Sequence, residues 1–291
     1  MTSQSHSTRG WINGFIGVVI FSGSLPATKA AISGFTPDFL TVARATIAGL
    51  LAVLILITFR QKFPSKKQLT ALCIVTSGVV IGFPLLTAFA LEHITSAHSM
   101  VFLGLLPLST AIFAVLRGGE RPRKAFWFFS VLGSFFVVSF AYLQGGESSL
   151  IGDLYMIAAI LLCGLGYAEG ATLAKQLGSW QVICWALVLS LPLMIILCLF
   201  LWPSTLNNVP TFAWGGLIYV SIFSMLIGFF FWYRGLSEGG IAGVGQLQLV
   251  QPFLGLMLSA WLLHETVSSL MMLATCGVIL CVAGSKHFTR K

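Results

Sequence analysis

Three glutamines, Gln246, Gln248 and Gln251, lie within six residues of one another in an otherwise apolar stretch. A glutamine side chain both donates and accepts hydrogen bonds, which suits a zwitterionic or amide-bearing ligand. Pro252 follows them and has no amide hydrogen, so the carbonyl of Gln248 loses its helical partner. This pattern predicts a polar binding site inside an apolar segment. The alternative is that the glutamines bond to neighbouring helices and only stabilise the fold.

The same stretch has a counterpart 145 residues earlier. The two copies share the spacing of an alanine, a proline and a glutamate: Ala97, Pro107 and Glu120 in the first, and Ala242, Pro252 and Glu265 in the second. Pro107 frees the carbonyl of Leu103 in the same way. A repeat of about half the chain, with a broken apolar segment in each copy, is typical of secondary transporters. We therefore predict that both prolines break membrane helices and take part in gating.

Two basic side chains, Lys29 and Arg44, stand inside apolar segments. An intramembrane cation usually faces the interior of a helix bundle or a water-filled cavity. Together they can bind the carboxylate of a substrate, Arg44 by a two-pronged contact. The alternatives are that Lys29 extends to the outer surface, and that Arg44 pairs with an internal carboxylate or with helix-end carbonyls.

Four further side chains are candidates for the same site. We expect His98 and Tyr167 to make polar contacts and Trp185 to stack on an aromatic substrate, although each is also a common packing residue. Glu169 is the one acid clearly within an apolar segment, and it is our candidate proton carrier. Its alternative is a surface ion pair with nearby Lys175.

The composition places the whole chain in a bilayer. Hydrophobic residues make up 57% and charged residues 8%, with a mean hydropathy of +0.95, whereas soluble domains carry about 25% charge. A membrane span needs about 20 mostly apolar residues. Ten segments meet this requirement: 11–32, 39–59, 69–91, 96–116, 125–143, 150–172, 182–201, 212–233, 241–263 and 267–284.

The basic residues orient these spans. With the N-terminus in the cytoplasm, cytoplasmic segments hold 14 of the 16 lysines and arginines, and the outer loops hold none. This positive-inside pattern predicts that both termini are cytoplasmic. It also explains the net charge of +8 without a nucleic-acid partner.

Five spans in each half is an odd number, so the second half must enter the membrane from the opposite side. We predict an all-α integral membrane protein whose ten transmembrane helices form two inverted five-helix repeats around a central cavity. The predicted units are a disordered cytoplasmic tail (1–10), a first repeat (11–145), an inverted second repeat (146–284) and a C-terminal cytoplasmic tail (285–291).

Signatures of enzymes and of metal sites are missing from the sequence. His264 and Glu265 begin a zinc-protease pattern, but Ser268 stands where the second histidine belongs. There is no Walker motif, and the six cysteines lack metal-ligand spacing. We expect no enzymatic activity, no cofactor and no metal.

In these sequence features the chain resembles the EamA-type, ten-span branch of the drug/metabolite transporter superfamily. Within that branch it resembles the bacterial aromatic amino-acid exporters. The resemblance covers nearly all residues from 11 to 284. It rests on the two repeats, the proline and glutamate echoes, and Lys29 and Arg44 in the first two spans.

This resemblance implies a multi-pass protein of the bacterial inner membrane that exports amino acids, aromatic ones included, to the periplasm by alternating access. The alternative is an exporter of cationic drugs or other small metabolites, and a more distant one is a membrane enzyme acting on lipid-like substrates. The expected partners are an amino acid and the lipid bilayer. We expect a monomer, with a homodimer as the alternative.

Overall fold

The computed structural model describes residues 2–118, 124–143, 149–206 and 208–287, in which the regular structure is helical and no strand occurs. In chain order the elements are α1 (Thr2–Ser22), α2 (Ser24–Ile32), α3 (Pro37–Thr58), α4 (Lys66–Val75), η1 (Thr76–Gly82), α5 (Phe83–His93), α6 (Ser96–Leu103), α7 (Leu106–Gly118), α8 (Lys124–Leu143), α9 (Leu150–Leu177), α10 (Ser179–Phe200), α11 (Thr211–Ile218), η2 (Tyr219–Ile227), α12 (Gly228–Gly239), α13 (Ile241–Gly245), η3 (Gln246–Val250), α14 (Gln251–Leu263) and α15 (Ser269–His287).

All ten predicted spans are helical. Seven continuous helical segments in the described residues are long and apolar enough to cross a bilayer. The other three spans correspond to α8, to the segment ending in α14, and to α15, and these are apolar helices too. The prediction of an all-α membrane protein is confirmed.

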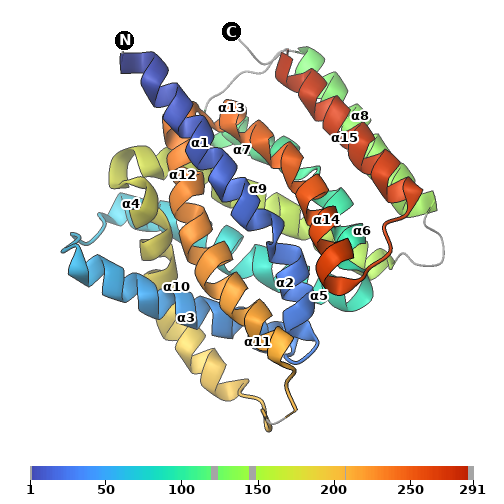
Figure 1. Ribbon diagram of the computed structural model, residues 1–291. Coiled ribbons are helices and arrows are strands. Elements are labelled where there is room, and N and C mark those ends of the chain that lie inside the picture. Colours follow the sequence, from blue (N-terminus) through green and yellow to red (C-terminus); the bar gives the residue numbers. More distant parts are fainter. Residues whose placement is uncertain (1, 119–123, 144–148, 207, 288–291) are drawn as a thin grey trace.

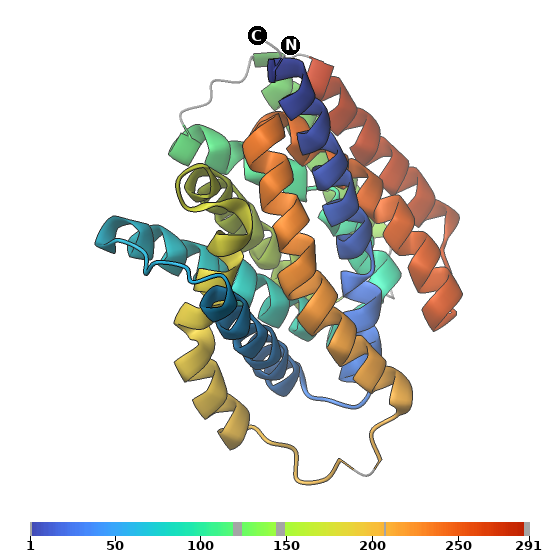
Figure 2. The ribbon, with the colours of Figure 1, turned by 60° about the vertical axis from the view of Figure 1, so that its left-hand side comes forward.

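The repeat is visible in where the helices begin. Five helices of the second half start 145 residues after five of the first: α11 after α4, α12 after α5, α13 after α6, α14 after α7, and α15 after α8 (for example, 228 − 83 = 145). The π-helical segments η1 and η2 end directly before α5 and α12, each of which completes the third span of its half. Figures 1 and 2 show that α1 begins and α15 ends at the same end of the bundle. Each half crosses the membrane five times, which is an odd number. The second half therefore starts from the opposite side of the membrane, and the two halves are inverted relative to each other.

Each half packs its first span against the third span of the other half. α1 lies along α12, and α9 lies along η1 and α5 (Figure 1). Glycines permit this closeness: a Cβ on Gly235 would stand 2.6 Å from the amide nitrogen of Gly14, and one on Gly78 would stand 2.5 Å from the carbonyl of Leu162. Close backbone approach through small residues is how membrane helices associate. The halves are therefore interlocked and do not form separate domains.

One expectation about the N-terminus is wrong. Residues 1–10 were expected to be disordered, whereas α1 already begins at Thr2. No proline or glycine stands between Thr2 and Arg9, so nothing in the sequence ends the helix where the apolar segment stops. Glu120, the predicted counterpart of Glu265, lies outside the described residues.

Candidate functional site

Both predicted helix breaks lie at their prolines. Pro107 and Pro252 each occupy the second position of a new helix, α7 and α14, where a missing amide hydrogen costs nothing. The expected free carbonyl at Gln248 is not free, because the amide of Gln251 donates to it across the 3₁₀ turn of η3. The tighter i+3 bond of that turn replaces the helical bond that the proline removes.

Arg44 lies at the centre of the bundle and is 5% exposed. Its Nη2 donates to the carbonyl of Val220 at 3.1 Å and to the hydroxyl of Ser224 at 3.4 Å. Both acceptors lie in η2, where π-helical turns shift the backbone bonds by one residue and mark a site of functional interest. Among the described residues, no carboxylate forms an ion pair with Arg44. Both of the hydrogen bonds described for this buried cation are therefore to neutral oxygens.

A small cavity borders Arg44. It has a volume of about 20 Å³ and is lined by polar and aromatic side chains that include Ser24, Ser224, Gln251 and Tyr167. A cavity of roughly 10–15 Å³ already accommodates one water molecule. The predicted central cavity therefore exists, but it is closed around a space far smaller than an amino acid.

Among the described residues, two side chains that line this cavity have a buried polar atom without a hydrogen-bond partner: Nε of Arg44 and Oε1 of Gln251. Nε1 of Trp232, whose ring packs on Tyr167, and both polar side-chain atoms of Gln248 are unpaired as well, but neither residue lines the cavity. Gln248 and Trp232 are completely buried. Native proteins leave few such groups unpaired, because each one costs its desolvation free energy. The two unpaired atoms at the cavity, a donor on Arg44 and an acceptor on Gln251, are groups that a polar ligand can bind.

Aromatic rings form one wall of the site. Tyr167 lies 6.4 Å from Phe21, 5.9 Å from Phe229 and 5.4 Å from Trp232, measured between ring centroids. Phe21, Tyr167 and Phe229 also line the cavity. Aromatic pairs at these distances stack favourably. The wall can therefore receive an apolar or aromatic side chain next to the cation of Arg44.

Four predicted site residues do not line the cavity, namely Lys29, His98, Trp185 and Gln248. The side chain of a fifth, Gln246, is outside the described part of the chain. Lys29 is half-buried and donates to the carbonyls of Leu91 and Ile94, at the C-terminal end of α5. A lysine at this position satisfies the last carbonyls of a helix. Trp185 packs on Phe63, whose side chain is 71% exposed. Neither Lys29 nor Trp185 lines the cavity.

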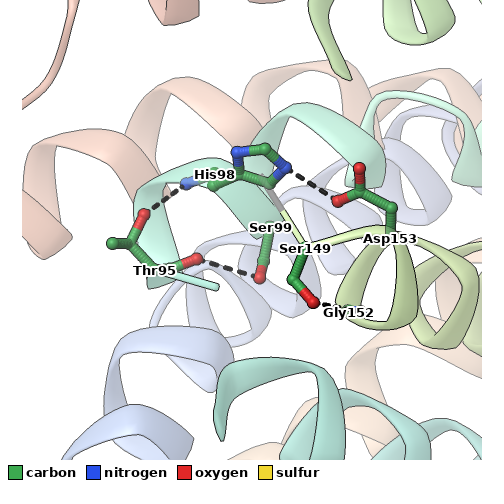
Figure 3. Close-up of polar contacts among 6 residues, drawn as sticks. All are labelled: Thr95, His98, Ser99, Ser149, Gly152 and Asp153. Carbon is green, nitrogen blue, oxygen red and sulfur yellow. Dashed lines mark hydrogen bonds and ion pairs between the residues drawn. The ribbon is translucent and has the colours of Figure 1, made fainter. Parts of the chain in front are cut away.

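His98 is buried away from the cavity. Its Nε2 lies 2.8 Å from Oδ1 of Asp153, and Figure 3 shows the pair between the first turns of α6 and α9. Thr95 accepts a hydrogen bond from the amide of His98, and Ser149 accepts one from the amide of Gly152. Each hydroxyl caps the start of its helix. The caps fix both members of the pair near their helix N-termini.

Glu169 forms an ion pair, although its partner is not the expected Lys175. Its Oε2 accepts from Nε of Arg117 at 2.8 Å, and the Arg117 side chain is 43% exposed. This contact joins the end of α7 to α9. In the described residues, no group of three or more His, Cys, Asp or Glu side chains is arranged to hold a metal ion.

A second and larger cavity, of about 690 Å³, lies away from these groups. It is a crevice between α2, α11 and α14, and its lining includes Pro26, Gly215 and Leu258 but no charged residue. An apolar crevice on a membrane bundle meets lipid chains, so its size alone does not make it the site. The polar groups lie instead around the small cavity beside Arg44.

Three residues in or near this site, Ser24, Ser224 and Trp232, could not be recognised from the sequence pattern. Ser24 and Ser224 were missed because a serine in an apolar span usually bonds to its own helix. Here their Oγ atoms lie 2.7 Å apart across the two halves. Trp232 was missed because nothing in the sequence separates it from the other tryptophans. Its burial without a partner for Nε1 is visible only in three dimensions.

Known proteins share this architecture. The sequence pattern of the EamA-like transporter family matches residues 8–142 and again 150–285. The chain is 61% identical to the uncharacterized transporter YdeK of Bacillus subtilis (strain 168), over 99% of this chain and 100% of that one. It is 20% identical to a probable terminal-alkyne amino-acid exporter of Streptantibioticus cattleyicolor, over 84% and 82% of the two chains.

A solved crystal structure at 18% identity has the same fold, with a TM-score of 0.71 over 95% of this chain and 97% of the other. The family match extends over both halves of the sequence, and each matched half contains one of the two proline-broken spans. The chain belongs to the EamA-like transporter family.

Proposed function

We propose that this transporter exports amino acids, aromatic ones included, and that Arg44 binds the substrate carboxylate. The observation that carries the proposal is the burial of Arg44 without a carboxylate partner in the described residues. A buried charge is costly unless it is paired. In membrane proteins such residues commonly mark substrate pathways. A carboxylate that binds two guanidinium nitrogens would supply the missing partner.

The remaining groups suit the rest of an amino acid. Gln251 brings an unpaired carbonyl oxygen to the cavity, which suits the ammonium group of an amino acid. Gln248, on the preceding turn, has an unpaired acceptor and an unpaired donor that can join the site when the bundle opens. Phe21, Tyr167 and Phe229 provide an aromatic wall for the side chain. A relative at 20% identity is described as a probable amino-acid exporter, which supports the same substrate class.

Binding requires the bundle to open. A cavity of about 20 Å³ cannot hold phenylalanine, so the halves must separate at one end to admit it. The breaks at Pro107 and Pro252 allow the helix segments on either side of the cavity to move separately. Alternating access then consists of opening one end at a time. We place the protein in the bacterial inner membrane with both termini in the cytoplasm. The proposed repeats are 11–145 and 146–284, with tails at 1–10 and 285–291.

Export of cationic drugs is the second candidate, and the site argues against it. Such a substrate needs an acidic residue deep in the cavity, whereas the cavity is lined by a cation and no acid. Glu169 is bound to Arg117 at the end of α7. It stays a predicted proton carrier, but it does not reach the cavity.

Counterflow in proteoliposomes tests the proposal. Vesicles are loaded with unlabelled phenylalanine, and uptake of labelled phenylalanine, threonine or glutamate from outside is followed. We expect saturable uptake of phenylalanine that other zwitterionic amino acids inhibit, and no uptake of tetraphenylphosphonium, a cation without a carboxylate. Uptake of the cation with no amino-acid exchange would overturn the proposal in favour of its rival.

A further inference from the structure

The central cavity lies on the axis that relates the two halves, because equivalent residues line it from both sides. Three pairs of its lining residues are 145 residues apart, the offset at which the helices of the two halves begin: Val79 and Ser224, Pro84 and Phe229, and Leu106 and Gln251 (for example, 251 − 106 = 145). Phe83 also lines the cavity, and its counterpart Gly228 has no side chain to contribute. The cavity is thus built from the same positions of both repeats.

One pair departs from this symmetry. Leu103 lines the cavity, whereas its counterpart Gln248 does not (248 − 103 = 145). Gln248 is completely buried, and in the described part of the chain neither polar atom of its side chain has a hydrogen-bond partner. A buried amide without partners is unfavourable. The protein therefore holds Gln248 in this position at a cost in stability.

The backbone explains why these two positions differ. In the first half, α6 is α-helical as far as Leu103. In the second half, α13 ends at Gly245, and the 3₁₀ segment η3 follows for five residues from Gln246. A 3₁₀-helix turns by about 120° per residue and an α-helix by about 100°. From Gln246 to Gln248 this difference adds up to about 60°, which is enough to turn a side chain away from the cavity.

There is space for η3 to adopt the α-helical form. A Cβ on Gly245, directly before η3, would meet no atom of the described residues within 4 Å. Its counterpart in the first half is Met100, which is completely buried. Glycine also changes its backbone dihedral angles at little steric cost. The second half therefore lacks the buried side chain that Met100 supplies in α6.

We propose that Gln248 is a substrate-binding residue of the transport state in which the two halves have exchanged their conformations. The halves are related by a pseudo-two-fold axis in the membrane plane, so this exchange is equivalent to turning the bundle upside down, as alternating access requires. In the exchanged state η3 is α-helical like α6, and Gln248 takes the place on the cavity wall that Leu103 has here. Its amide then donates to and accepts from the polar groups of the substrate.

The chemistry of the equivalent pairs supports this role. The second half carries a polar residue at three positions where the first half carries an apolar one: Ser224 for Val79, Gln248 for Leu103 and Gln251 for Leu106. Two of these three polar residues already line the cavity. The exchange brings the third to the same site.

This inference rests on the proposed function for the identity of the substrate, and it gives the substrate a part in the conformational change. A ligand favours the state with which it makes more contacts. An amino acid that bonds to Gln248 only in the exchanged state therefore promotes the exchange. It also supplies the partners that the amide of Gln248 lacks in this structure.

Thiol accessibility tests the exchange without a substrate. In a background with the six native cysteines replaced by alanine, Gln248→Cys is purified and treated with sulfonatoethyl methanethiosulfonate, a small anion that reacts from water. Val79→Cys is the positive control, because Val79 and its counterpart Ser224 both line the cavity. Leu256→Cys is the matched negative control: Leu256 is buried on α14, and neither it nor its counterpart Ala111 lines the cavity.

We expect Gln248→Cys to react at least about tenfold faster than Leu256→Cys, although both positions are buried in this structure, because the exchanged state is populated in the free protein. Reaction of Val79→Cys alone overturns the proposal, since the cavity then opens without Gln248. Equally fast reaction at Leu256→Cys also overturns it, because that would reflect a general loosening of the bundle.

Gln248→Met in the wild-type background separates binding from folding and does not depend on the cysteine replacements. Its melting temperature should equal or exceed that of the wild type, because an apolar side chain of similar shape replaces two unpaired buried polar atoms. The initial rate of phenylalanine counterflow should fall at least about fivefold, as expected for the loss of one hydrogen bond. Leu256→Met, which conserves volume, should transport within about twofold of the wild type.

The outcomes distinguish this proposal from the proposed function. A parallel fall in melting temperature and transport would show that Gln248 is structural, and unchanged transport by Gln248→Met would show that it does not bind the substrate. Either result overturns the proposal. Absence of amino-acid counterflow in the wild type would refute amino-acid export, and the labelling rates would then decide the exchange by themselves.

Discussion

The hydroxyl oxygens of Ser24 and Ser224 lie 2.7 Å apart, and Nη2 of Arg44 approaches the second of them at 3.4 Å. Ser24 follows the break between α1 and α2, and Ser224 lies in the π-helical segment η2. Irregular helical turns from opposite halves thus meet at the one cation that lines the central cavity. Such irregularities weaken the helix that contains them and persist where function needs them.

Arg44 is expected to be required for transport and dispensable for folding. Arg44→Ala should lower the initial rate of phenylalanine counterflow at least about tenfold, because a hydrogen bond to a charged group contributes about 1.5–3 kcal/mol. Arg44→Lys should have an intermediate rate, since an ammonium cannot make a two-pronged contact. The melting temperature of Arg44→Ala in detergent should stay near that of the wild type, because the substitution removes a buried charge that has no carboxylate partner in the described residues. That of Arg44→Lys should also stay near it, because an ammonium can still donate to the carbonyl of Val220.

The matched control for Arg44 is Arg234→Ala, an exposed arginine paired with Glu238 on its own helix. It should transport within about twofold of the wild type, because exposed pairs contribute roughly 0–1 kcal/mol. Counterflow by Arg44→Ala at the wild-type rate would remove Arg44 from the site. A large fall in the melting temperature of both Arg44 variants would show a structural role instead.

Glu265 is expected to stabilise the junction between the halves. Its two carboxylate oxygens accept from the amides of Ser96, at 3.1 Å, and of Ala97, at 2.8 Å. An anion at a helix N-terminus is favourable because it satisfies free amides and opposes the helix dipole. Glu265→Ala should lower the free energy of unfolding by about 1–2 kcal/mol. Glu265→Gln should lower it less, because one amide oxygen can still accept.

Thermal melting of the purified protein, followed by tryptophan fluorescence, measures this effect. Glu92→Gln is the control, since Glu92 is exposed at the end of α5 and accepts no such bond among the described contacts. The proposed cap is refuted if Glu265→Ala melts at the wild-type temperature.

Gly78 is expected to be intolerant of any side chain. A Cβ at this position would lie 2.5 Å from the backbone carbonyl of Leu162, which cannot move without displacing α9. Gly78→Ala should destabilise the protein by about 1–3 kcal/mol, as overpacking does. Gly215→Ala is the control, because a Cβ there meets no atom within 4 Å. Equal melting temperatures for the two variants would contradict the close packing of η1 on α9.

The orientation of the bundle is expected to follow its basic residues. Green fluorescent protein fused after residue 291 should fluoresce, because it folds in the cytoplasm, and alkaline phosphatase at the same position should be inactive. Fusions made after Ser204, in the loop between α10 and α11, should give the opposite result. Fluorescence from the Ser204 fusion would reverse the proposed direction of transport.

The sequence alone determined the properties that depend on composition and on residue spacing along the chain. The composition showed that the chain lies in a lipid bilayer, because so few charged residues cannot cover a water-facing surface. The 145-residue echo anticipated where helices of the second half begin, as α7 and α14 show at Pro107 and Pro252. Prolines break helices through their own covalent structure, so these positions needed no knowledge of the fold.

Only the tertiary structure decided which polar residues meet. Arg44 contacts Ser224, 180 residues away, and His98 contacts Asp153 across the two halves. Lys29, equally plausible from the sequence as a carboxylate ligand, turns instead to the end of α5. A change of one residue rotates a side chain by about 100° around its helix. Whether a residue faces the cavity therefore depends on how ten helices pack together, and a single sequence does not specify this.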